Sequence, residues 1–290
     1  MISFTSILDD FHIPYHTTGN KTRSGWVNIK CPYCGKDPYM GYCLIYRYVT
    51  CWNCGYHSLA ETIHNLTRIP LSECISLTKE LPKDISLYTP HKGELKEPSC
   101  QTRIRSQFAT YLKNRKIHKN KIDLWGLKGL LPTSKSSTGI RLGWRIYLPI
   151  YLRGEIVSWT TRKIVNSEPR YISAKAEESL VPIENCIYGL DFVQNTAIIC
   201  EGPFDAIAVG IGGVAVMGLG ISSSQMATLS SIPHRVIVFD SETNAQIRAK
   251  KLANDLSLFP GTTQIVTLET GNDPASAKKE EIDYLRKQFL

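Results

Sequence analysis

Four cysteines near the start of the chain have the spacing of a metal site. Cys31 and Cys34 form one C-x2-C pair, and Cys51 and Cys54 form a second pair after 16 intervening residues. Four thiolates complete the tetrahedral shell of Zn2+ and leave no open position for water. The spacing therefore predicts one structural zinc ion.

Carboxylates form a second group of residues that could do chemistry. Five of them follow short apolar segments in the last hundred residues: Glu201, Asp205, Asp240, Glu242 and Asp273. A single acid at such a place is often only a favourable partner for a helix N-terminus. Several together repel one another unless a cation lies among them, and oxygen ligands of this kind suit Mg2+ or Mn2+. We expect one or two such ions here.

The elements around these acids predict how they are positioned. Apolar strands are expected at 196–200, 213–217, 235–239 and 263–268, alternating with helices at 204–210, 244–258 and 276–289. This alternation indicates a mostly parallel α/β sheet, whose sites lie at the carboxyl ends of its strands. Asp240 and Glu242 are two residues apart, so both side chains face one way if the strand stays extended.

The cysteine pairs lie in a module of their own over residues 1–68. Strands expected at 26–30 and 42–50 each lead into a cysteine pair, which is the order of a zinc ribbon. Ser58 and Glu61 form a capping box that opens a helix ending near Arg68. Residues 69–98 contain four prolines and are predicted to be a linker with one short helix at 71–80.

Residues 99–190 are predicted to form a mixed α+β subdomain that carries the positive charge. The whole chain has a net charge of +8, but residues 96–190 alone carry seventeen Lys and Arg against seven Asp and Glu. A helix is expected at 103–116, and strands at 144–152 and 155–162 with a turn at Gly154. So concentrated an excess favours a polyanion partner such as nucleic acid.

Composition also indicates the kind of cellular compartment in which the protein works. The nine cysteines are odd in number and scattered, which argues against a disulfide framework and for a reducing environment. No apolar run approaches the ~20 residues that span a bilayer, and the N-terminus lacks the basic start of a signal peptide. We expect a protein of a reducing compartment such as the cytoplasm, with no membrane partner.

Three acidic motifs resemble a known catalytic fold. Segments 200–205 (CEGPFD), 238–242 (VFDSE) and 271–274 (GNDP) resemble successive motifs of Toprim domains. Segments 144–150, 159–162 and 168–175 resemble the basic half of a primase core. The order of zinc ribbon, basic subdomain and a Toprim subdomain at 191–290 resembles bacterial and phage DNA primases.

This resemblance implies an enzyme that makes short RNA primers from NTPs on single-stranded DNA during replication. It implies Asp240 and Glu242 as Mg2+ ligands, Asp273 as a further ligand, Glu201 as a ligand or a base, and Asp205 as an orienting group. Two motifs depart from the family pattern. The family usually has Asp-x-Asp where this chain ends in Glu242, and a second acid where this chain has Ala275. The occupancy of a second ion is therefore open.

Basic and aromatic side chains are candidates for binding DNA and nucleotides. Four of them lie in the stretches that resemble the primase core: Arg145, Arg162, Arg170 and Lys175. Arginine suits bidentate contact with phosphate. In the ribbon, Arg47 and Trp52 combine a cation with a surface for base stacking, although such aromatics can instead form the small core of the ribbon.

Two other functions remain open at this point. A Toprim nuclease or repair factor would carry similar acids, and a non-catalytic zinc-ribbon DNA-binding protein would carry a degenerate Toprim fold. The sequence has no G-x4-GK[ST] motif, so a primase of this kind is expected either to work with a separate helicase or to be the primase part of a longer primase–helicase. The compact size indicates a phage origin.

Overall fold

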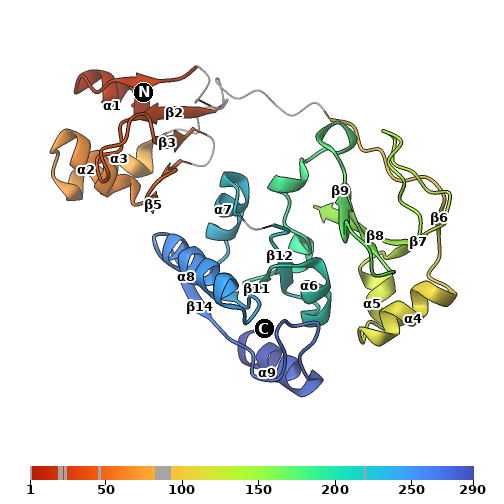
Figure 1. The fold of residues 1–290 in the computed structure, drawn as a ribbon. Helices are drawn as coiled ribbons and strands as arrows, with labels where there is room; N and C mark the ends of the chain where they lie inside the picture. The colour runs from red at the N-terminus through yellow and green to blue at the C-terminus, as the bar shows by residue number, and fades with distance from the viewer. Residues whose placement is uncertain (1, 19–21, 23–24, 45–46, 82–92, 219) are drawn as a thin grey trace. The chain divides into compact units, whose positions relative to one another are not determined.

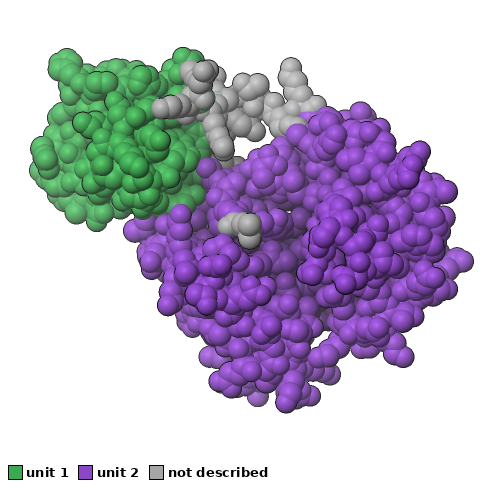
Figure 2. All heavy atoms as spheres, viewed as in Figure 1, with its two compact units in different colours: residues 1–90 green, residues 91–290 purple. Residues whose placement is uncertain are grey.

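The computed structural model describes residues 2–18, 22, 25–44, 47–81, 93–218 and 220–290. The chain divides into two compact units, residues 1–90 and 91–290 (Figure 2). Each unit has its own hydrophobic core, so each is described by itself.

The first unit is built on a five-stranded antiparallel sheet whose strands pair in sequence order (Figure 1). The strands are β1 (Tyr15–His16), β2 (Trp26–Ile29), β3 (Met40–Cys43), β4 (Tyr48–Cys51) and β5 (Gly55–His57). The helices are α1 (Phe4–Asp10), α2 (Leu59–Thr67) and α3 (Leu71–Glu80). The ring of Phe4 stacks on that of Tyr42 at 4.1 Å, which joins α1 to the sheet.

The single strand expected over 42–50 is wrong. The chain reverses there, so that β3 and β4 pair with Cys43 opposite Tyr48. The N–H of Arg47 donates to the carbonyl of Cys43 at 2.8 Å, and Arg47 has a φ of 57°. A run of aromatic and β-branched residues favours extended backbone on both sides of this turn, so the pattern alone does not reveal the reversal.

Two helices complete the first unit. Ser58 caps α2, because its Oγ accepts from the N–H of Glu61 at 3.4 Å as the capping motif predicts. The short helix predicted at 71–80 is present as α3, and its Cys74 is buried in the core that also includes Ile63. Leu81 belongs to the same core. The expected linker over 69–98 therefore begins with residues that pack on the ribbon, while 82–92 lie outside the described residues.

The second unit begins with a second antiparallel sheet, ordered β10-β9-β8-β7-β6. Its strands are β6 (Gln101–Thr102), β7 (Lys128–Leu130), β8 (Arg145–Leu152), β9 (Glu155–Lys163) and β10 (Tyr171–Ser173), with helices α4 (Ser106–Asn114) and α5 (Lys119–Leu124). Arg153 and Gly154 both have positive φ in the β8–β9 turn, as a two-residue hairpin requires. Asp191 accepts both of their N–H groups, at 2.8 and 2.7 Å.

The predicted parallel sheet is also present, with strand order β12-β11-β13-β14 and every pair parallel. Its strands are β11 (Thr196–Cys200), β12 (Gly213–Ala215), β13 (His234–Ile237) and β14 (Thr262–Ile265). Its helices are α6 (Pro203–Val209), α7 (Ser223–Ser230), α8 (Thr243–Ser257) and α9 (Lys279–Phe289). The strand order changes direction between β11 and β13, and this is where open α/β sheets bind ligands.

One core joins the two sheets of the second unit. Trp125 stacks on Tyr188 at 5.0 Å, and both belong to a cluster that includes Leu148 of β8 and Phe204 of α6. Tyr188 also forms a β-bridge with Ala215 at the edge of the parallel sheet. The basic subdomain and the acidic sheet are therefore held in one fixed arrangement.

Among the helices that the structure describes, none has the length and apolar character needed to cross a bilayer.

Candidate active site and zinc site

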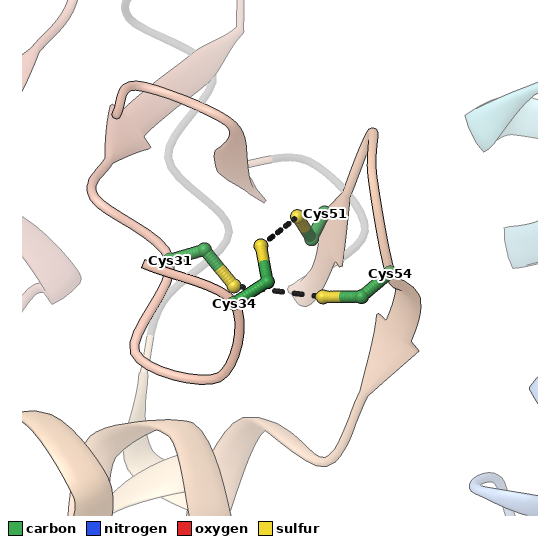
Figure 3. A group of neighbouring side chains, drawn as sticks. All are labelled: Cys31, Cys34, Cys51 and Cys54. Atoms are coloured by element: carbon green, nitrogen blue, oxygen red, sulfur yellow. Dashed lines mark hydrogen bonds between the residues drawn. The ribbon is translucent and has the colours of Figure 1, made fainter. Parts of the chain in front are cut away.

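The four predicted cysteines converge at the tips of the first-unit sheet (Figure 3). All four sulfurs lie within 4.8 Å of one another, and the Cys31–Cys54 and Cys34–Cys51 sulfurs are 3.6 Å apart. A tetrahedral shell with Zn–S bonds of about 2.3 Å separates its sulfurs by about 3.8 Å. The donor set and its spacing thus fit one structural zinc ion.

Backbone geometry prepares the thiols for this ion. The N–H of Lys36 faces the sulfur of Cys34 and lowers the pKa of that thiol to about 7. Gly35 has a φ of +72°, a conformation that glycine adopts without strain. Nε2 of His57 lies 3.1 Å from the sulfur of Cys54, and the His57 ring stacks on Tyr33 at 3.8 Å. His57 therefore contacts a zinc ligand, as residues just outside a metal shell commonly do.

An aromatic surface lies on the same sheet. Trp52 is 48% exposed, and its ring centroid is 5.9 Å from that of the largely buried Trp26. A Cβ at Gly41 would meet both indoles at 2.6 and 2.7 Å, so the absence of a side chain lets the two rings lie across the strand. Arg47 donates to the carbonyl of Leu81 at 3.0 Å. The surface thus offers an exposed ring held by a buried one.

The second unit gathers four of the five predicted acids around one cavity of about 440 Å³. Glu201 follows β11, Asp205 lies in the first turn of α6, Asp240 follows β13, and Asp273 lies between β14 and α9. The amide of Ala275 donates to Oδ1 of Asp205 at 3.3 Å. The acids therefore meet at the strand edge that the alternating pattern predicts.

Glu242 is not placed with this group. β13 ends at Ile237, so the extended backbone assumed between Asp240 and Glu242 does not continue. Glu242 is the N-cap of α8, its side chain is exposed, and it does not line the cavity. Its carboxylate still acts on Asp240 through space, because it contributes to the raised pKa of that residue.

Burial and mutual repulsion perturb two acids of the cavity. Burial, followed by the charges of Asp273 and Asp240, raises the pKa of Asp205 to about 7. Burial, followed by the charges of Glu201, Asp273 and Glu242, raises the pKa of Asp240 to about 6. Perturbed carboxylates in one cavity mark a candidate functional site. Their oxygens suit a hard divalent cation, but among the described residues only the four cysteines form a group of three or more whose ligand atoms all lie within 4.8 Å of one another.

Cations from the basic subdomain line the same cavity. Arg162 of β9 and Arg170, two of the candidates for binding DNA or nucleotides, line it together with Arg115 from the end of α4. The guanidinium of Arg162 lies 4.8 Å from the ring centre of Tyr171, and its Nε donates to the hydroxyl of Tyr111 at 3.1 Å. The three arginines also line an adjoining cavity of about 300 Å³, which contains no acidic residue among its described lining.

Two predicted cations do not lie in this site. Arg145 is 1% exposed, and its guanidinium donates to the carbonyls of Pro169 and Arg170 at 2.6 and 3.1 Å. Its role is to hold the segment that carries Arg170. Lys175 is exposed and does not line either cavity. The prediction that Arg145 contacts DNA or nucleotides is therefore wrong for this arrangement, because the strand directs that side chain inward.

Three site residues escape sequence reasoning. Arg115 stands in a lysine-rich helical stretch that resembles a solvated face, yet its guanidinium lies 5.4 Å from the ring centre of Phe204. Tyr171 and Arg248 carry no spacing signal at all. Nη2 of Arg248 contacts Oε1 of Glu201 at 2.6 Å across the parallel sheet. Only the fold brings these side chains to the acids.

Comparisons with known proteins agree with this geometry at the level of fold. No protein-family model matches the chain, and no curated protein matches it in sequence. The Aquifex aeolicus primase, comprising zinc-binding and RNA polymerase domains, is 18% identical with a TM-score of 0.53, and the match covers 100% of this chain and 83% of that one.

Two further structures match the second part of the chain. A DnaG primase catalytic domain bound to single-stranded DNA is 16% identical, with a TM-score of 0.53 over 64% of this chain and 73% of that one. A DNA primase domain from Pseudomonas aeruginosa is 20% identical, with a TM-score of 0.52 over 63% and 71%. The chain therefore has the fold of the zinc-binding and RNA polymerase domains of bacterial DNA primases.

Proposed function

We propose that the chain is a DNA primase that joins NTPs into short RNA primers on single-stranded DNA for replication. One observation carries this proposal: a single cavity places Glu201, Asp205, Asp240 and Asp273 opposite Arg115, Arg162 and Arg170. Catalysis of nucleotidyl transfer rests on positioning the reactants and neutralising their charge. It therefore needs carboxylates that hold a divalent cation and arginines that bind phosphate on the facing side.

The acids would hold Mg2+ or Mn2+. Glu201, Asp240 and Asp273 lie at the ends of neighbouring elements around the cavity, and carboxylate oxygen is the ligand these ions prefer. A bound ion would supply the positive charge that lowers the pKa of an attacking 3′-hydroxyl and stabilises a departing pyrophosphate. Asp205, which is buried and accepts the Ala275 amide, orients this wall of the cavity.

The arginines would bind the triphosphate. Arg162 is held from two sides by Tyr111 and Tyr171, so its guanidinium is already ordered before a nucleotide arrives. Arg170 is carried by the segment that Arg145 fixes. The adjoining cavity continues the same cationic wall away from the acids, which suits the phosphates beyond the reacting one.

The zinc ribbon would bind the template. Trp52 presents its ring to solvent, and nucleobases of any sequence stack on such a surface. A similar primase catalytic domain has been solved with single-stranded DNA, which supports the same kind of template here. We further propose that the protein works with a replicative helicase, as a separate partner or in one longer chain, in the cytoplasm of a bacterium or a phage-infected cell.

A template-directed synthesis assay tests the proposal. The zinc-loaded protein is incubated with single-stranded DNA of varied sequence, labelled NTPs and Mg2+, and the products are resolved by size. Short RNA that depends on the template is the expected result. Cleavage of the DNA in place of synthesis would identify a Toprim nuclease, and binding with neither product would identify a non-catalytic DNA-binding protein.

A further inference from the structure

Glu201 of the acidic cavity forms an ion pair with Arg248, a residue that the predicted site does not include. Nη2 of Arg248 lies 2.6 Å from Oε1 of Glu201, and the two side chains are 30% and 19% exposed. A charged hydrogen bond this short in a partly buried place is stronger than a surface ion pair. Glu201 is therefore held by an arginine at the place where a divalent cation would bind.

The arginine is fixed by the helix that carries it. α8 starts two residues after Ser241, and the side-chain amide of Gln246 donates to the carbonyls of Asp240 and Phe239 at 2.8 and 3.3 Å. These bonds tie the first turns of α8 to the segment that follows β13. Arg248 follows on the same helix, so its guanidinium reaches the end of the neighbouring strand β11 from an ordered base.

The donor set around this pair lacks two carboxylates of the family pattern. Ala275 stands at the point where a second acid of the last motif would stand, and its amide contacts Asp205. Glu242 does not line the cavity. Asp240 and Asp273 then remain, together with the second oxygen of Glu201, and this is a ligand set for one ion rather than two.

We propose that Arg248 is a positioning residue that supplies, as a fixed guanidinium, the positive charge that a second divalent ion would bring. It neutralises one oxygen of Glu201 and limits the acidic site to one ion. This inference rests on the proposed function, since it concerns the same cavity.

Binding of Mn2+ tests it without any synthesis assay. The full zinc-loaded chain is titrated with Mn2+, and free Mn2+ is counted by electron paramagnetic resonance. We expect one ion in the wild type that is lost in Asp240→Asn. In Arg248→Gln the site loses a positive charge, and Mn2+ should bind about tenfold more tightly. Arg248→Lys retains the charge and should restore the wild-type affinity.

The matched control is Lys250→Gln, which removes an equal charge from an exposed position of the same helix and should leave binding unchanged. Two ions of similar affinity in the wild type, or an unchanged or weaker affinity in Arg248→Gln, would overturn the role of Arg248 alone. A wild type with no Mn2+ site that depends on Asp240 would overturn the proposed function as well.

Discussion

The two candidate metal sites of this chain are organised in opposite ways. In the ribbon, four sulfurs already lie within 4.8 Å of one another, on two knuckles shaped by backbone hydrogen bonds. In the second unit, the acids come from two strand ends, a helix and a loop, and the described carboxylates do not converge to that distance. The difference follows from charge, because thiols pack together whereas ionised carboxylates repel one another.

Folding of the first unit brings the cysteines of the zinc site together, whereas the acidic site is completed only when a cation binds. The cysteines lie at the ends of short strands whose pairing brings them together. Glu201 is paired with Arg248, and burial, followed by the charges of the neighbouring acids, raises the pKa values of Asp205 and Asp240. A bound cation relieves the repulsion between these acids.

Removing a zinc ligand should have the largest effect. Cys31→Ser leaves three thiolates, and structural zinc contributes roughly 10 kcal/mol or more of apparent folding free energy to small modules. We expect residues 1–81 to lose protection in hydrogen exchange while the second unit keeps its own. The control is Cys100→Ser, an exposed cysteine outside the site. A ribbon that stays protected in Cys31→Ser would show that its core suffices without the metal.

The second largest effect should come from Asp240→Asn. The change removes a carboxylate of the cavity without altering its size, and we expect primer synthesis to fall by roughly a thousandfold, or about 4 kcal/mol. Binding of single-stranded DNA, measured by fluorescence anisotropy, should change little. Glu242→Gln is the comparison, since Glu242 does not line the cavity and should lose less activity. Equal losses of activity in the two variants would mean that Glu242 is a ligand of the metal site.

Asp205→Asn should raise the free energy of unfolding of the second unit by an amount that depends on pH, because it removes a buried charge. The pKa of Asp205 is raised from 3.8 to about 7, so the folded state favours its protonated form. That stabilisation is complete below about pH 4 and is lost as the pH rises through 7. Without Mg2+, the variant should be more stable than the wild type by roughly 2 to 4 kcal/mol at pH 8, and nearly equal at pH 4.

Urea denaturation at the two pH values measures this difference. The transition of the second unit is the one to follow, because Asp205 lies in α6. A difference that does not vary with pH would mean that Asp205 acts through its hydrogen bond with the Ala275 amide rather than through its charge.

The smallest effect should come from the aromatic surface of the ribbon. Stacking contributes about 1–3 kcal/mol per base, so Trp52→Ala should weaken binding to single-stranded DNA roughly tenfold. Tyr284→Ala is the matched control, because Tyr284 is 67% exposed on α9 in the other unit. Equal effects of the two changes would mean that the ribbon does not bind the template and that its zinc is purely structural.

Local patterns predicted the parts of the molecule that local chemistry determines. The zinc site needs two short motifs, and the parallel sheet needs an alternation of apolar strands with helices, so both were confirmed as a four-cysteine cluster and a mixed α/β fold. The reversal near Arg47 was missed because residues on either side of it favour the same extended backbone. The functional roles of the acids stay predictions.

The direction in which a side chain points was the feature that could least be predicted from the sequence. Arg145 and Arg162 both lie in strands of one sheet and look alike in sequence, yet the first is buried against backbone carbonyls and the second lines the cavity. The contacts of Arg115 and Arg248 depend on helices that meet parts of the fold distant in sequence. Such directions are decided by tertiary packing, which no spacing rule contains.

The inward placement of Arg145 is one case of a wider feature. Lys121 of α5 donates to the carbonyls of Ile207 and Ala208 at 2.7 Å, where burial lowers the pKa of its ammonium group. Arg145 and Lys121 bind backbone carbonyls within the fold, so they displace no counterions from a DNA backbone. The salt dependence of DNA binding should therefore correspond to fewer phosphate contacts than the seventeen lysines and arginines of residues 96–190 would suggest.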